Sequence, residues 1–170
     1  MGDANEYRAF ADAGMGGISS VVATLPAGAT LGEARVVNGV KYRLVCNAST
    51  SAQQVPGTLL SPLAGGGPYS VGTGSSQLFA HIGAALVVHA TVPTANFFWG
   101  AIAGSGLKVI GDNTSVPTGS AFYISGNGAV TLFPQSIITG NVVAGINLGG
   151  SASKTVTTGA ASGDCLLLLD

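Results

Sequence analysis

The clearest pattern in the chain runs from Glu33 to Asn47, where apolar and polar side chains alternate on both sides of an Asn-Gly pair. Asn38 and Gly39 are residue types that adopt positive φ at both central positions of a two-residue type I′ turn, so the pattern predicts a β-hairpin. Such a turn also fixes the register of the two strands. The predicted pairs are Val37 with Val40, Val36 with Lys41, Arg35 with Tyr42, and Ala34 with Arg43.

The two faces of this hairpin differ in character, because side chains alternate between the faces of a strand. The face expected to join the core carries Val37, Val40, Tyr42, Leu44 and Cys46, together with Glu33 and Arg35. The opposite face carries Val36, Lys41, Arg43 and Val45, and we expect it to form a basic surface.

Further short runs of β-branched and aromatic residues follow, separated by Gly, Pro, Asn and Ser. They predict strands at Ser19–Leu25, Gly57–Leu60, Tyr69–Val71, Ala84–Val92, Phe97–Ala103, Leu107–Ile110, Ala121–Ser125, Ala129–Phe133, Asn141–Asn147, Lys154–Thr157 and Cys165–Leu169, with a polar loop at Ser49–Gln54. So many short strands with almost no helical pattern predict one all-β domain over residues 18–170, a barrel or sandwich of short antiparallel strands.

Two further hairpins and one tight turn are expected within this domain. Pro93–Asn96 should connect Ala84–Val92 to Phe97–Ala103, and Gly126-Asn127-Gly128 should connect the strands on either side of it. Gly104-Ser105-Gly106 should turn the chain between Phe97–Ala103 and Leu107–Ile110.

The strand Phe97–Ala103 is apolar on both faces, with Phe97 and Trp99 on one side and Phe98 and Ile102 on the other. Such a strand is either central in the sheet or covered by a neighbouring subunit. On the second interpretation, Phe97 and Trp99 are candidate interface residues.

Residues 1–17 read as an N-terminal arm, because Gly14, Gly16 and Gly17 limit any helix to two short turns. Asp3 and Glu6 lie beside Arg8 in this arm, which makes these three residues candidates for a docking contact. The alternative is an ordinary solvated chain end.

The amino-acid composition says more about the partners of this chain than any motif does. Charged residues make up 8% of the chain, the net charge is −1, and no charged residue lies between Leu44 and Leu107. Such a surface does not favour a free monomer, so we expect a homo-oligomer, most simply a trimer. It also does not fit nucleic acid as the main partner, which requires a basic face.

No membrane partner is expected, because no apolar run is long enough to span a bilayer and MGDANEYR does not resemble a signal peptide. Lys41 and Arg43 form a compact basic pair, which predicts either contact with an acidic partner surface or an ordinary solvated strand face.

Candidate chemistry is sparse. His81 and His89 are too far apart along an extended strand to share a metal ion, and neither sits in a recognisable nucleophile motif. Cys46 and Cys165 are expected to be buried free thiols. We therefore predict no catalytic residues, no metal site, no cofactor and no enzymatic activity.

The segment VNGVKYRLVCNASTSAQQVPGTLLSP resembles the opening of small structural proteins of tailed bacteriophage heads. The later segments Phe98-Trp99-Gly100, Gly119–Phe133, NVVAGINLGG and CLLLLD are similar to the same β-rich decoration, or cement, proteins. The resemblance covers Glu33–Asp170. It implies a small oligomer, such as a trimer, on the outside of an assembled capsid, with the major capsid protein as partner.

The expected function is therefore capsid stabilisation by a virion protein made in the host cytoplasm, which bridges neighbouring capsid subunits. The alternative is a phage fibre, spike or tail module whose loops bind a receptor or glycan.

Overall fold

A computed structural model describes residues 17–49, 54–63, 66–73, 83–111, 118–124, 128, 130–132, 143–149 and 163–169 of the chain. Within them every regular element is a β-strand, so the all-β class is confirmed. The strands are β1 (Val21–Val22), β2 (Ala34–Val37), β3 (Val40–Asn47), β4 (Leu59–Pro62), β5 (Ser70–Gly72), β6 (Ala85–Leu86), β7 (Phe97–Val109), β8 (Ala121–Ile124), β9 (Val130–Leu132), β10 (Gly145–Gly149) and β11 (Gly163–Leu168).

The hairpin β2–β3 forms with the predicted turn and register. Asn38 and Gly39 have φ angles of 50° and 77°, as a type I′ turn requires. All four predicted cross-strand pairs are present, from Val37 with Val40 at the turn to Ala34 with Arg43. Local turn chemistry alone is therefore sufficient to set this part of the sheet.

The division of the hairpin into a core face and a surface face is only partly right. Tyr42 and Leu44 are buried as expected, and Cys46 is half-buried. Val45, which was assigned to the surface face, is also fully buried. Both faces of β3 are therefore covered in this half of the strand, because Leu44 and Val45 point to opposite faces and both are fully buried.

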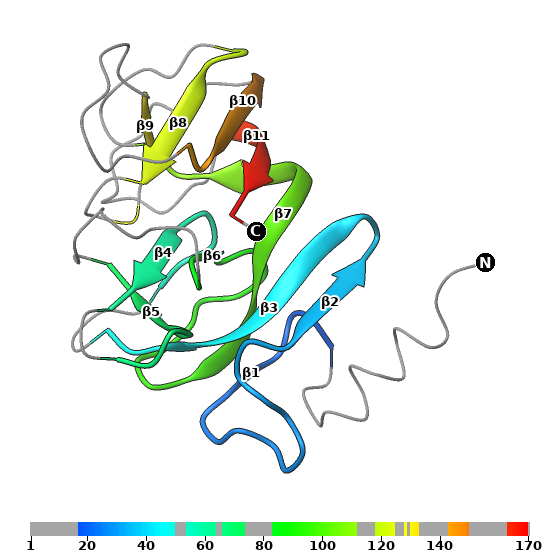
Figure 1. The fold of residues 1–170 in the computed structure, drawn as a ribbon, viewed down its shortest axis with the longest axis vertical. Helices are drawn as coiled ribbons and strands as arrows, with labels where there is room; N and C mark the ends of the chain where they lie inside the picture. Colours follow the sequence, from blue (N-terminus) through cyan, green and yellow to red (C-terminus); the bar gives the residue numbers. More distant parts are fainter. Residues whose placement is uncertain are drawn as a thin grey trace.

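The strands form one mixed sheet, in which one group of strands pairs into a closed ring. The strand order is β2-β3-β5-β4-β6-β7-β11-β10-β8-β9, and β3 also pairs directly with β7. Five strands, β3, β5, β4, β6 and β7, thereby make a closed circuit, while β11, β10, β8 and β9 extend from the second half of β7 (Figure 1). A barrel that includes all the strands is not confirmed. The pairing of β3 with β5 is parallel, in contrast to the predicted wholly antiparallel arrangement.

The turn predicted at Gly104-Ser105-Gly106 is absent, and β7 continues through it as a single 13-residue strand. Figure 1 shows β7 running from the lower group of strands to the upper group. Gly104 and Gly106 have φ angles of 137° and 71°, and the register between β7 and β11 shifts opposite this segment. The glycines therefore bend the strand instead of reversing the chain, because β11 pairs with it on both sides of the bend.

Of the other two predicted hairpins, β8–β9 has the expected antiparallel pairing, from Phe122 with Leu132 to Ile124 with Val130. In the second, β6 and β7 are antiparallel neighbours, but they meet only at Leu86 and Ala101. The Val87 amide instead donates a hydrogen bond to the Thr58 carbonyl, and Val92 forms an isolated β-bridge with Gln54. Most of Ala84–Val92 therefore packs as a loop. The predicted strand Lys154–Thr157 lies outside the described residues.

The core lies inside the circuit and continues along β7 to β8, β10 and β11. Its largest fully buried side chains include Leu44, Leu59, Leu60, Leu86, Trp99, Ile102, Phe122 and Leu167. One buried amide ties the loops to this core: Asn47 Nδ2 donates to the carbonyls of Val92 and Pro93, at 3.0 and 3.1 Å. This anchor holds the end of the loop that carries His89.

Candidate interaction surfaces

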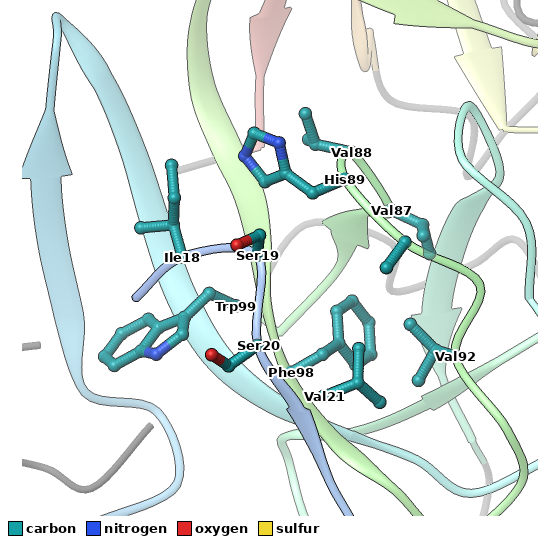
Figure 2. Close-up of a pocket in the computed structure, with 11 residues that line it drawn as sticks. Ile18, Ser19, Ser20, Val21, Val87, Val88, His89, Val92, Phe98 and Trp99 are labelled. Carbon is teal, nitrogen blue, oxygen red and sulfur yellow. The ribbon is translucent and has the colours of Figure 1, made fainter. Parts of the chain in front are cut away.

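A narrow cleft lies where the segment before β1 meets the loop after β6. Its walls come from three places in the chain: Ile18–Val21, Val87–Ala90 with Val92, and Phe98–Trp99 of β7. Figure 2 shows the first two segments facing each other, with Phe98 between them. The cleft encloses about 10 Å³ of space, which is the room that one water molecule needs. Small-molecule sites are larger by more than an order of magnitude, so this cleft is not shaped for a substrate.

His89 at this cleft contacts Tyr42 of β3. The Tyr42 hydroxyl lies 3.4 Å from His89 Nε2, and the two rings stack with their centroids 5.9 Å apart. Partial burial lowers the pKa of the His89 imidazole below its ordinary value of 6.5, and burial raises the pKa of the Tyr42 hydroxyl above 10.0. Both shifts favour the neutral forms, so this contact is a neutral packing interaction between the β6–β7 loop and the hairpin.

Serine hydroxyls from Ser19 and Ser20 complete the polar lining of the cleft. In the part of the chain that the structure describes, no group of three or more His, Cys, Asp or Glu side chains could hold a metal ion. Cys46 and Cys165 are free thiols, with Cys165 buried and Cys46 half-buried. Burial raises the pKa of the Cys46 thiol, which makes it a poorer nucleophile at neutral pH.

The predicted basic pair, Lys41 and Arg43, lies on one face of β3 as the alternation requires, and both residues are half-buried. The Arg43 guanidinium carbon lies 5.8 Å from the centre of the Tyr69 ring, at a distance typical of a cation–π contact. Arg43 therefore has a packing role within the chain, while Lys41 lies nearer to the Asn38-Gly39 turn of the hairpin.

The two aromatic interface candidates occupy different environments. Trp99 is only 2% exposed, so its side chain offers almost no surface to a neighbouring subunit. The prediction that Trp99 forms an interface is corrected: its strand is central, and β3 and β6 flank it. Phe97 is half-buried, pairs with Val22 and packs against the edge of the core. The remaining candidates, Asp3, Glu6 and Arg8, lie outside the described residues.

Among the described residues, three large apolar side chains are exposed. The hairpin pattern placed Val36 on a surface face, and the other two were not predicted to be exposed. Val36 on β2, Leu148 on β10 and Leu168 on β11 are 46%, 49% and 43% exposed. Ile146 pairs with Leu166 across β10 and β11, so these strands carry apolar residues on their outer face as well as on their buried face. The exposure of Leu168 could have been predicted from the run of leucines near the C-terminus. Consecutive side chains of a strand point to opposite faces, so such a run places leucines on both faces.

Comparisons with known proteins identify no relative: no protein-family model, no curated protein and no solved structure matches this chain. A search of the described residues for a helix long and apolar enough to cross a membrane finds none.

Proposed function

We propose that this chain is a structural protein of a tailed-bacteriophage virion, which binds the outside of the assembled capsid and bridges major capsid subunits. One observation carries the proposal. A surface with very few charges also exposes large apolar side chains, Val36, Leu148 and Leu168, on three strands of a rigid sheet. Single exposed apolar side chains occur on monomers too, so the low charge is the stronger support, because it does not favour a free soluble monomer and suits a protein packed against other surfaces.

The mechanism would be preferential binding. A protein that binds the closed shell more tightly than separate capsid subunits stabilises the shell by mass action. The all-β core suits this role, because a sheet that is already formed loses less conformational entropy on docking than a segment that folds when it binds. The resemblance of Glu33–Asp170 to decoration proteins supports the same assignment.

The second candidate is a fibre, spike or tail module with glycan- or receptor-binding loops. The water-sized cleft at His89 is too small to hold a sugar, so the binding loops of such a module would lie elsewhere on the chain.

Locating the protein in intact virions tests the proposal. Gold-labelled antibodies against the purified chain should decorate capsids of the phage that encodes it, in a regular array. Labelling confined to the tail would favour the second candidate, and unlabelled virions would overturn both.

A functional test follows from the mechanism. Heads assembled without the chain should rupture at a lower temperature, and purified chain added to them should restore the rupture temperature. A Leu148→Asp, Leu168→Asp variant with an unchanged melting temperature is a suitable comparison, because it removes exposed apolar groups without altering the buried face of the sheet. If heads without the protein are as stable as complete heads, the capsid-stabilising role is wrong.

A further inference from the structure

The strand β2 lies at the open end of the sheet. Among the described strands it pairs only with β3, and it is the first in the strand order (Figure 1). A terminal strand presents unpaired amide and carbonyl groups along its outer side, which makes it a template for another strand.

The printed hydrogen bonds identify the outward groups. The Leu44 amide donates to the Glu33 carbonyl at 2.9 Å, so Glu33 points its carbonyl toward β3. Backbone direction alternates along a strand, so Arg35 and Val37 also bond to β3, while Ala34 and Val36 direct their amide and carbonyl groups outward. The side chains at these two outward positions are small or apolar, and Val36 is 46% exposed. The edge therefore lacks the Lys or Pro residues that commonly block strand addition.

The charges beside this edge are self-complementary. Glu33 and Arg35 form an ion pair on the face of the hairpin opposite Val36, with side chains that are 21% and 35% exposed. When two copies of β2 lie antiparallel with Ala34 facing Ala34 of the second copy, Glu33 of each copy faces Arg35 of the other. The four side chains then form an alternating cluster with no net charge, and opposite charges directly across two strands are stabilising.

We propose that two copies of this chain associate through their β2 strands, which pair antiparallel about a two-fold axis and join the two sheets. Such an interface is isologous, so it closes at two copies and does not propagate into a fibre. The inference does not rest on the proposed capsid role, since capsid binding can fail while the dimer stands. It also differs from the trimer that the family resemblance implies, and a mass measurement separates the two.

The first test removes the outward amide. Val36→Pro deletes an outward N–H that has no hydrogen-bond partner among the described residues and that faces Gly32 of the second copy when Ala34 faces Ala34. Pro is tolerated at the outer side of an edge strand. Val36→Thr keeps the N–H and the side-chain shape, so it is the matched control. Sedimentation equilibrium of the full chain should show a dimer for the native protein and Val36→Thr, and at least about tenfold weaker association for Val36→Pro, equivalent to ~1.4 kcal/mol.

The second test exchanges charges and still works if Val36→Pro fails to fold. Glu33→Arg alone places two positive charges opposite each other at each contact, and Arg35→Glu alone places two negative charges there. Each variant should associate at least about tenfold more weakly than the native chain. Mixing the two variants restores opposite charges at both contacts, so a mixed dimer should form. A role for the Glu33–Arg35 pair only within one chain does not predict this rescue.

Any one of the following outcomes overturns the proposal. One is a native chain that is monomeric even at about 100 μM. Another is a dimer or trimer that persists unchanged in Val36→Pro. A third is a failure of the two charge variants to form a mixed dimer when they are combined. A native monomer that dimerises only after residues 1–16 are deleted would also overturn it, because the edge would then be occupied by the chain's own N-terminal segment.

Discussion

At the scale of single residues, the contact between His89 and Tyr42 links protonation to folding. Burial lowers the pKa of His89 in the folded state below 6.5, so in the pH range just under 6.5 the unfolded chain binds more protons than the folded chain. The contribution of His89 to stability is therefore complete above pH 6.5 and is lost as the pH falls through the folded-state pKa.

We expect the free energy of unfolding to decrease between pH 7.5 and pH 5, and His89→Gln to reduce that decrease. Urea denaturation at several pH values measures both. His81→Gln is the control, since it removes the only other histidine and should leave the His89 contribution in place. An unchanged pH dependence in His89→Gln would show that burial at the cleft has no thermodynamic consequence.

The placement of Trp99 changes what its substitution should do. Because this side chain is buried within one chain, Trp99→Ala should lower the free energy of unfolding by about 4 kcal/mol at any protein concentration. Phe97→Ala on the same strand should cost less, since Phe97 is only half-buried. If Trp99→Ala leaves folding unchanged and weakens only self-association, the original interface prediction was right and the core assignment is wrong.

At the scale of elements, the sequence predicts structure well where the determinants are local. The β2–β3 register follows from two turn residues, and the β8–β9 hairpin follows from a Gly-Asn-Gly segment between alternating runs. Predictions fail where a distant strand decides the outcome. Gly104-Ser105-Gly106 has the composition of a turn, yet pairing with β11, some sixty residues later in the chain, keeps β7 continuous through it. No local pattern contains that partner.

The bend in β7 gives a prediction that separates its two glycines. Gly106 has a φ of 71°, close to the left-handed region that Asn tolerates, and a Cβ there would meet open space. Gly104 has a φ of 137°, which side-chain-bearing residues rarely adopt, and a Cβ there would lie 3.1 Å from the Val40 Cα. Gly106→Asn should therefore be nearly neutral, whereas Gly104→Asn should cost about 2 kcal/mol. Urea unfolding curves measure both, and equal costs would contradict this account of the bend.

At the scale of the whole molecule, the sequence pattern does not determine which side chains of the finished sheet are exposed. Low charge and two-faced strands predict an assembling protein, and that stays a prediction. They led to Trp99, which is buried, and not to Leu148 or Leu168, which are exposed. Exposure depends on which strands lie beside each other in the finished sheet. The alternation of β3 did place Lys41 and Arg43 together, because that placement needs only the strand itself.

The last prediction concerns how the basic face of β3 acts in the proposed assembly. If Lys41 meets an acidic capsid surface, Lys41→Glu should slow binding to capsid shells by roughly three- to tenfold, and the difference should shrink as salt is raised, because salt screens exposed charges. Lys41 is the better choice for reversal because Arg43 packs over Tyr69, so changing Arg43 would also disturb the fold. Lys108→Glu makes the same change in net charge at an exposed position on the second half of β7, away from the hairpin. Because Lys108 lies opposite Asp164, it serves as the control only if its melting temperature equals that of the native chain. Stopped-flow or surface-based kinetics with both variants measures the effect. Equal slowing by the two substitutions would mean that only net charge matters, and Lys41 would then be an ordinary solvated residue.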